Sequence, residues 1–198
     1  MKKILFLFFF ICLLYSIYPE KSKKKFNFEK VKIVWLSWIN EERKKNNLHP
    51  YKYHYMLNET AKKWCLISLN RGDISHKRNI NDPVFYNYKE IKNWFLRLKI
   101  KFKNIKGYTF TENIAWGYFN YKSGNYTDYV IKSIRKTFND YISEKGKTDY
   151  WESAHYRSII APYFYYIGLG LVIDEKNKKY YLTVHYASEV IEVKDEDK

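Results

Sequence analysis

Two strand-like runs end the chain, and the segment between them is too short for anything except an antiparallel connection. Residues 167–174 and 179–188 are rich in β-branched and aromatic side chains, and four polar residues separate them. Parallel strands need a crossover of about a dozen residues or more, whereas antiparallel strands can be joined by a short turn. The chain is therefore predicted to close with a β-hairpin.

Helical periodicity dominates the part of the chain that precedes this hairpin. Apolar residues recur at intervals of three and four, which predicts helices over residues 31–45, 53–70, 83–101 and 128–143. The glycine-bounded residues 107–117 predict a short strand or an ordered loop. Because the helices come first and the clear strands last, the pattern indicates the α+β class rather than an alternating βαβ array.

Two glycines interrupt the first strand of the hairpin. Gly168 and Gly170 lie within it, shortly after a break marked by Pro162. Glycine inside a strand indicates a bulge or the close approach of another segment. His155 precedes the break and is predicted to lie in a loop that leads into the sheet, with its side chain facing a cleft. On this stretch alone, an ordinary half-buried histidine is the alternative interpretation.

The first 18 residues have the pattern of an export segment. Lys2 and Lys3 precede an uninterrupted apolar run, which has the length of a signal peptide and is slightly short of the roughly 20 residues of a membrane span. Ser16 is the candidate small residue for cleavage. Cys12 is a candidate lipidation site, although Ile11 before it is not the small residue of a bacterial lipobox. We therefore expect a secreted or outer-surface protein, with membrane association through this segment.

The remaining chain divides into a tether, one domain and a tail. Residues 19–30 are rich in lysine and polar, which is typical of a tether between membrane and domain. Residues 31–188 are long enough for a single core, and the charged residues 189–198 are expected to fray. Once the leader is set aside, Cys65 is the single remaining cysteine. An internal disulfide is therefore excluded, and Cys65 is interpreted as a small core residue.

The formal charge of +15 is large, but it is weak evidence for the kind of partner that the protein binds. Lysine, asparagine, tyrosine and isoleucine are abundant and alanine is scarce, as an AT-rich bacterial genome would produce. A basic surface attracts anionic lipid, acidic glycan or nucleic acid. The lysines are dispersed, and no nucleic-acid-binding motif accompanies them, so nucleic acid is not expected as a partner.

Several short motifs occur in the order in which they occur in one known family. The chain resembles the CAP superfamily, which comprises cysteine-rich secretory proteins, insect venom antigens, plant pathogenesis-related proteins and bacterial SCP-like proteins. The segments that carry the resemblance are Asn40-Glu41-Glu42-Arg43, Leu57-Asn58-x-x-Ala61-x-x-Trp64-Cys65, Glu112-Asn113-Ile114-Ala115-x-Gly117, His155-Tyr156-Arg157 with Ile167-Gly168-x-Gly170, and the closing strand Leu182–Tyr186. Thr111 stands where the family motif has a glycine.

The resemblance implies an α-β-α sandwich, with an antiparallel sheet between helical layers and a central cleft. In many members two histidines and two acids line that cleft and can hold a divalent cation. Carried over to this chain, these positions are His76, Glu112, His155 and Asp140. Asp140 ends the run Thr137-Phe138-Asn139-Asp140, which replaces the family's Trp-Tyr-x-Glu, and Glu144 one turn later is the alternative acid. Asn113, Tyr156 and Glu144 are the expected ligand-cleft residues.

These residue types suit zinc, which binds neutral imidazole and carboxylate and can polarise a water at an open position. No cofactor is expected to be obligatory. His185, in the last strand, is interpreted as structural. The sequence contains no His-Glu-x-x-His, Gly-x-Ser-x-Gly, Cys-x-x-Cys or phosphate-binding loop.

Three functions follow from these observations. The first is a non-enzymatic binding module that presents a cleft to a lipid, sterol or protein ligand. The second is a metal-dependent hydrolase, such as a peptidase, that uses the histidines and acids. The third is a basic surface adhesin for acidic glycans or anionic lipid. The missing catalytic motifs favour the first.

Overall fold

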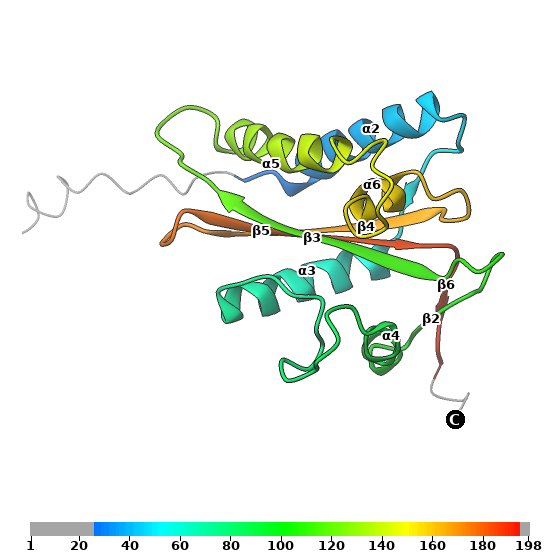
Figure 1. The fold of residues 1–198 in the computed structure, drawn as a ribbon. Helices are drawn as coiled ribbons and strands as arrows, with labels where there is room; N and C mark the ends of the chain where they lie inside the picture. Colours follow the sequence, from blue (N-terminus) through cyan, green and yellow to red (C-terminus); the bar gives the residue numbers. More distant parts are fainter. Residues whose placement is uncertain (1–25, 195–198) are drawn as a thin grey trace, which may run out of the picture.

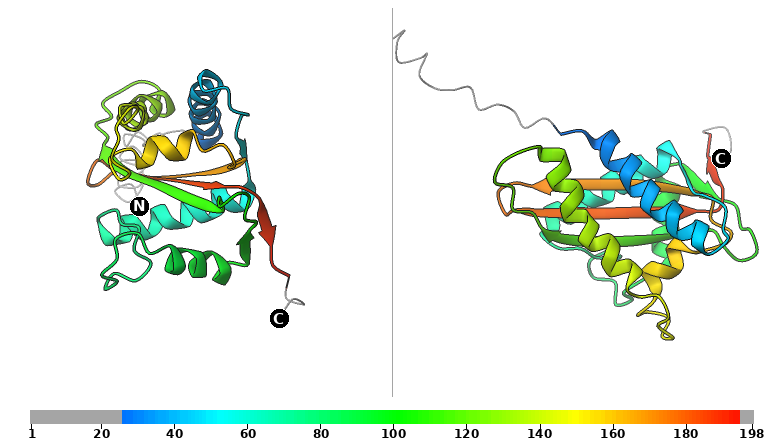
Figure 2. Two further views of the ribbon diagram at one scale, coloured as in Figure 1. Left: turned by 45° about the vertical axis from the view of Figure 1, so that its right-hand side comes forward. Right: turned by 90° about the horizontal axis from the view of Figure 1, so that it is seen from above.

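A four-stranded sheet lies between two layers of helices in the computed structural model, which describes residues 26–194 (Figure 1). Helices α2, α5 and α6 cover one face, and α3 and α4 cover the other (Figure 2). This confirms the expected α-β-α sandwich. The elements are α2 (Phe28–Lys45), β1 (Lys52–Tyr53), α3 (Tyr55–Arg71), α4 (Tyr88–Arg97), β2 (Ile100–Phe102), β3 (Phe110–Tyr118), α5 (Tyr126–Ile142), α6 (Ala154–Ile159), β4 (Tyr166–Asp174), β5 (Lys179–Ala187) and β6 (Val190–Glu192).

The predicted hairpin is the centre of the sheet. Strands β4 and β5 pair antiparallel from Tyr166↔Ala187 to Asp174↔Lys179, and the strand order is β1-β4-β5-β3. Strand β3 pairs antiparallel with β5, so three of the four strands match the expected antiparallel sheet. The two-residue β1 instead runs parallel to β4. A long connection containing α3 separates β1 from β4 in the chain, and such a crossover permits a parallel pair.

The structure corrects two predicted boundaries in the α4 layer. The third helix spans Tyr88–Arg97 rather than residues 83–101, because Lys99 adopts a positive φ of 60° and the chain turns into β2. Strand β2 pairs antiparallel with β6, which lies in the segment predicted to fray. The backbone groups of this part of the tail are thus satisfied by a distant strand.

Three of the helices in the described residues, α2, α4 and α5, begin directly after an asparagine. Asn27, Asn87 and Asn125 each accept a hydrogen bond from a backbone amide of the first turn of α2, α4 and α5, respectively. These caps satisfy amides that have no partner within the helix. Because Asn27 caps α2, this helix begins at Phe28, inside the segment predicted as a tether.

The two glycines of β4 lie under helix α3, as the sequence led us to expect. A methyl group at Gly168 would lie 2.0 Å from the carbonyl carbon of Leu57, and one at Gly170 would lie 2.2 Å from that of Ala61. Both distances are far inside van der Waals contact. Absence of a Cβ therefore allows the backbone of α3 to rest directly on the backbone of β4.

Within residues 26–194, no helix is both long enough and apolar enough to cross a membrane. The predicted export segment, with Cys12, and the last four residues of the predicted tail lie outside the described residues.

We predict that Gly168→Ala and Gly170→Ala each lower the free energy of unfolding by about 3 kcal/mol, because the new methyl group must push α3 off the sheet. Gly124→Ala is the control. Gly124 has a φ of +95° and open space around it, so that substitution should cost about 1 kcal/mol through backbone strain alone. Urea denaturation measures all three. Equal losses at the three positions would contradict the close approach.

Candidate functional site

The family motif in β3 supplies polar side chains to both faces of the sheet. Successive side chains of a strand point to opposite faces. The Glu112 carboxylate contacts residues in the α3 and α4 layer, whereas the Asn113 amide donates to the His155 carbonyl oxygen (3.1 Å) and the Tyr186 hydroxyl (3.2 Å) on the other side. The candidate site therefore consists of two polar clusters separated by the sheet.

Glu112 is the centre of the first cluster and is buried, with a fully covered side chain. Its Oε1 accepts from His76 Nδ1 (2.8 Å) and from an Arg78 guanidinium nitrogen (2.7 Å). Its Oε2 accepts from the other terminal nitrogen of Arg78 (2.8 Å) and from His185 Nε2 (3.0 Å). Strand pairing brings His185 there, because it lies directly opposite Glu112 in the register of β3 and β5.

The charge of Arg78 decides the protonation of this cluster. Burial alone would raise the pKa of Glu112, but the adjacent guanidinium and the hydrogen bonds from both histidines hold that pKa well below its usual range. Burial lowers the pKa of His185, although Glu112 opposes this effect. A neutral His185 that donates from Nε2 must accept at Nδ1, and the Thr60 hydroxyl lies 2.9 Å from that nitrogen.

Aromatic rings enclose the guanidinium of Arg78. Its carbon lies 3.7 Å from the ring centre of Trp64 and 4.6 Å from that of Trp94, and the side chain is 1% exposed. Guanidinium groups stack well on indole rings, and the interaction strengthens when water is excluded. The cation thus contacts a bidentate carboxylate at its tip and two indole rings whose planes lie at 73° to each other.

The second cluster is built around Glu144, which caps helix α6. Its Oε2 accepts from the backbone amides of His155 (2.9 Å) and Tyr156 (3.0 Å), and its Oε1 contacts His155 Nδ1 at 2.5 Å. A carboxylate at a helix N-terminus accepts hydrogen bonds from amides that have no partner within the helix. Its negative charge also interacts favourably with the positive end of the helix dipole. The imidazole of His155 also stacks on Tyr141, with ring centres 4.4 Å apart. His155 is consequently helical rather than in the predicted loop.

The other predicted cleft residues connect elements of the fold. Tyr156 is buried, and its hydroxyl donates to Glu42 on α2 (3.0 Å). Lys45 and Lys145 also contact the Glu42 carboxylate, at 3.2 and 3.4 Å. Asn113 ties β3 to α6 through the His155 carbonyl. These side chains hold the helical layer on the sheet.

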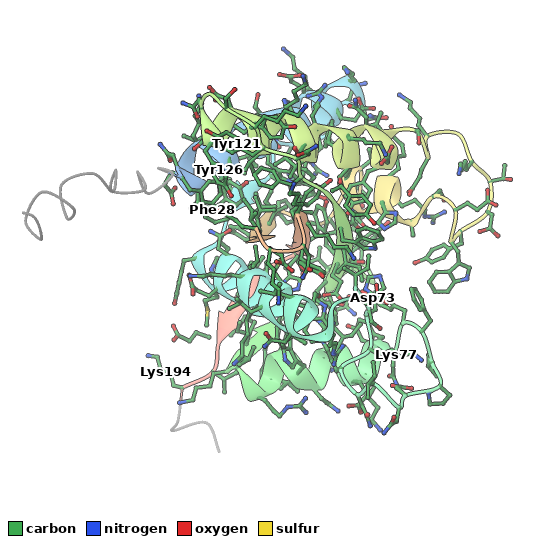
Figure 3. The ribbon with its side chains drawn as sticks, turned by 90° about the vertical axis from the view of Figure 1, so that its left-hand side faces the viewer. Phe28, Asp73, Lys77, Tyr121, Tyr126 and Lys194 are labelled. Carbon is green, nitrogen blue, oxygen red and sulfur yellow. The ribbon has the colours of Figure 1, made fainter. Side chains whose placement is uncertain are left out.

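Glu144, rather than Asp140, is the acid that contacts His155. Asp140 lies on the outer face of α5, where its side chain is 64% exposed and pairs with Lys136 at 3.5 Å. His76 and Glu112 belong to one face of the sheet and His155 to the other. Figure 3 shows Asp73 and Lys77, which precede and follow His76 in the sequence, on the side of the sheet that α3 and α4 cover. Within residues 26–194, no group of three or more histidine, cysteine, aspartate or glutamate side chains is arranged to hold a metal ion.

The residues present do not fit the divalent cation that the resemblance implied. An ionised carboxylate offers about four lone-pair sites, and four nitrogen donors already contact the oxygens of Glu112. Two of those donors carry the positive charge of Arg78, which repels a metal ion. The cluster around Glu112 is a hydrogen-bonded ion pair.

Sequence reasoning did not single out Arg78 or Thr60, and it treated His185 as structural. Arg78 lies in a polar stretch whose apolar residues show no helix or strand periodicity. The direction of its side chain therefore depends on how the loop folds. His185 could have been connected to Glu112 only through the register of β3 against β5. Thr60 lies on the buried face of the predicted second helix, where hydroxyl side chains are common.

A groove of about 480 Å³ opens on the outer side of the α3 layer. Helix α3 forms one wall, and Leu98 with Ile100 forms the other. The lining is mainly apolar, while Lys62 and Lys63 lie at its exposed side. Thr60 takes part in this lining and also contacts His185, so the groove and the Glu112 cluster share a residue.

Comparison with known proteins identifies the fold and the motifs together. The CAP family, described as the cysteine-rich secretory protein family, matches residues 36–186. The chain belongs to this family. The match contains both polar clusters, and the CAP motifs of β3 and α6 supply Glu112 to the first and His155 and Tyr156 to the second. A search of curated proteins found no match.

Solved bacterial CAP structures share the fold. An outer surface protein of Borrelia burgdorferi is 16% identical with a TM-score of 0.55, and the match covers 83% of this chain and 98% of that one. The CAP domain of enterococcal PrgA is 19% identical (TM-score 0.51; 89% and 65% covered). An extracellular SCP-domain protein of Bacillus anthracis is 14% identical (TM-score 0.50; 80% and 40% covered). All three are similar to this chain in fold, and two of them, the Borrelia and Bacillus proteins, are an outer surface protein and an extracellular protein.

We predict that stability falls as the pH drops from 7 to 5, partly through His185. Its pKa is lowered in the folded state, so the unfolded chain, with a histidine pKa of about 6.5, binds more protons in this window. The slope is at most about 1.4 kcal/mol per pH unit for each such histidine. His185→Gln keeps a donor for Glu112 and should flatten the decline measured by urea denaturation.

His54 serves as the control, because burial also lowers its pKa. His54→Gln should remove only the part of the pH dependence of stability that His54 contributes. The part contributed by His185 should remain. The depressed pKa of Glu112 acts at lower pH, since its contribution is present above about 4.3 and is lost as the pH falls through its folded value. An unchanged slope in His185→Gln would contradict the assignment.

Proposed function

We propose that this CAP domain is an exported, non-enzymatic binding module whose ligand is an anionic amphiphile with a single acyl chain. The observation that carries this proposal is the groove between α3 and β2, with its apolar lining and its lysines. Its volume lies within the range of about 300–1,000 Å³ that is typical of small-molecule sites. Fold similarity gives no information about the ligand, so the proposal rests on this groove.

The chemistry of the groove favours a chain with a negative head group. Met56, Leu66, Leu98 and Ile100 offer aliphatic surface along its length. Lys62 and Lys63 are exposed and outnumber the one acid in the lining, Glu59. An acyl chain would remove this apolar surface from water, and a carboxylate or phosphate at its end would lie near the two ammonium groups.

The polar clusters support binding rather than hydrolysis. Glu112 accepts four hydrogen bonds and has a strongly lowered pKa, which makes it a weak base. His155 contacts the Glu144 carboxylate and stacks on Tyr141, which hold its partly exposed imidazole against the domain. A hydrolase would need a base that can reach a substrate or a metal with an open position.

We predict that the fluorescent fatty acid cis-parinaric acid binds the protein and that the double variant Lys62→Glu/Lys63→Glu weakens this binding about tenfold. Each exposed charge contact contributes up to about 1 kcal/mol, and 1.4 kcal/mol corresponds to tenfold in affinity. Leu66→Glu should weaken binding as well, because it places a charge on the apolar wall. Fluorescence titration measures the affinities.

The matched control is Lys89→Glu/Lys92→Glu on α4, which changes the net charge equally but lies outside the groove lining. Its affinity should equal that of the wild type at physiological salt. A neutral analogue, monoolein, should compete poorly with the acid. Equal loss in both double variants would indicate attraction by net charge alone, and failure of Leu66→Glu to weaken binding would place the ligand elsewhere.

Export is the second part of the proposal. The basic, apolar pattern of residues 1–18 and the extracellular or outer-surface setting of the similar structures support it. Deletion of residues 1–18 should retain the protein in the cytoplasm, as cell fractionation would show. Labelling with palmitate should be lost in Cys12→Ala if this cysteine is lipidated. Identical fractionation of the truncated and full-length chains would refute export by this segment.

A further inference from the structure

We propose that one end of the domain lies against the anionic lipid surface of the membrane into which residues 1–18 insert. We call it the entry end, because the described chain begins there at Phe26. Three features support this orientation, which are the short connection to the apolar segment, the exposed aromatic side chains and the excess of lysines. The inference rests on the export segment of the proposed function and is independent of the groove.

Three segments meet at the entry end, as Figures 1 and 3 show. They are the start of α2, the end of β3 with the loop that follows it, and the turn between β4 and β5. The Asn27 amide donates to the Thr127 hydroxyl at the start of α5 (2.9 Å), and the Phe119 amide donates to the Lys178 carbonyl oxygen in the turn (2.7 Å). These contacts hold the segments together as one continuous surface.

The connection between the apolar segment and the entry end is short. Residues 19–25 separate the two, and a chain extends by at most about 3.6 Å per residue, so Phe26 lies within about 25 Å of the last apolar residue. Helix α2 then continues from this end for 18 residues, which corresponds to about 27 Å. Of the two ends of α2, the entry end is therefore the one that the chain holds near the membrane.

Exposed aromatic side chains lie at the entry end. Tyr118 is 71% exposed, Trp116 40% and Phe26 37%. The rings of Trp116 and Tyr118 meet edge to face with their centres 5.4 Å apart, and the Phe26 ring meets that of Tyr126 in the same way at 6.0 Å. Tyrosine and tryptophan collect at membrane–water interfaces, because each combines an apolar ring with a polar group. These side chains therefore suit the head-group region of a bilayer.

Lysines accompany the aromatic rings. Lys122 is exposed in the loop after β3, and Lys176 and Lys178 are exposed in the turn between β4 and β5. The ammonium group of Lys179 lies 4.6 Å from the ring centre of Trp116. A phosphate or carboxylate of a lipid head group that reached these rings would thus lie among positive charges.

The acidic side chains of the entry end have partners within the domain. These pairs are Asp128 with Lys30 (2.6 Å), Glu29 with Lys32 (2.8 Å), Glu175 with Tyr126 (2.9 Å) and Asp174 with Asn177 (2.6 Å). The four lysines at positions 122, 176, 178 and 179 lie beyond those that form these pairs. Positive charge is consequently in excess at this end.

The connection itself adds to this charge. It contains Lys21, Lys23, Lys24 and Lys25 against one acid, Glu20. Basic clusters beside a membrane segment are typical of binding to anionic head groups, and each lysine near such a surface favours the bound state about fivefold. The entry end therefore fits an anionic bilayer better than a zwitterionic one.

The test is whether Trp116 contacts the bilayer. The full-length chain is reconstituted in phosphatidylserine vesicles whose acyl chains carry bromine close to the glycerol backbone, which quenches tryptophan at the interface. Part of the fluorescence of the six tryptophans should be quenched, and Trp116→Phe should abolish most of that quenching. Unchanged quenching in Trp116→Phe would overturn the proposal.

Trp151→Phe is the matched control. Trp151 is 64% exposed and meets Tyr150 edge to face at 5.2 Å, but it lies in the loop beyond the far end of α5. This substitution should leave the bromine quenching as it is in the wild type. Equal loss in Trp116→Phe and Trp151→Phe would contradict an orientation through the entry end.

Charge variants test the kind of lipid. Lys122→Glu/Lys176→Glu should lower the ratio of domains in contact with the bilayer to those out of contact more than tenfold, and high salt should act in the same direction. Lys89→Glu/Lys92→Glu on α4 changes the net charge equally and should retain the quenching. Equal quenching in brominated phosphatidylcholine vesicles would overturn the assignment to an anionic surface.

Two further measurements separate this proposal from the proposed function. Flotation of the vesicles reports whether residues 1–18 anchor the chain, and a full-length chain that does not float with them would overturn the proposed orientation. Leu66→Glu, which tests the groove, should leave the quenching of Trp116 intact. Because reconstitution bypasses secretion, failure of export in cells and failure of Trp116 to contact the bilayer are distinct results.

Discussion

The direct contact between helix α3 and strand β4 is the constraint on which the rest of the domain depends. Gly168 and Gly170 leave no side chain between the two backbones, so α3 lies closer to the sheet than a layer of Cβ atoms would permit. Side chains of α3 consequently reach into the sheet. Asn58 accepts from the Leu169 amide at 2.9 Å, and Thr60 reaches His185. The position of α3 against the sheet also determines one wall of the groove, because residues of α3 line it.

Alternation along β3 then distributes the family motif between two layers. Glu112 joins the α3 layer by an ion pair, while Asn113 joins the α5–α6 layer through amide hydrogen bonds. A buried ion pair is weak evidence for stability, because desolvation offsets much of its Coulomb energy, yet removing one partner leaves an uncompensated charge. The arrangement therefore constrains the geometry of both layers more than it adds to the stability of either. A strand that slipped by one residue would send both side chains to the wrong face.

The sequence predicted the features that depend on local pattern and missed those that depend on distant partners. Helical period and the closing hairpin located α2, α3, α5, β4 and β5 to within a few residues, and the glycines predicted the close approach. The predicted end of α4 was wrong because the residues that follow the helix form β2. This strand pairs with β6, which lies some 90 positions later in the chain. Motif order placed His76 and Glu112 together, but nothing in the local pattern indicated that Arg78 would enter between them. Glu144 was only the alternative acid, because capping of α6 arises from tertiary packing.

Buried polar contacts perform the cross-linking that disulfides provide in many secreted domains. Cys65 is free and buried, and a short helix such as α6 cannot be stable by itself. Glu144 satisfies its first amides, and Tyr156 reaches across to Glu42 on α2. At the other end of α6, the Arg43 guanidinium donates to the carbonyl oxygens of Ile159 and Ala161, at 2.8 and 2.9 Å, from a fully buried position. Since Glu42 and Arg43 belong to the first family motif and Tyr156 to a later one, the motifs of this chain are explained by the need to attach α6 to the rest of the domain. That need would persist in a member that binds no metal at all.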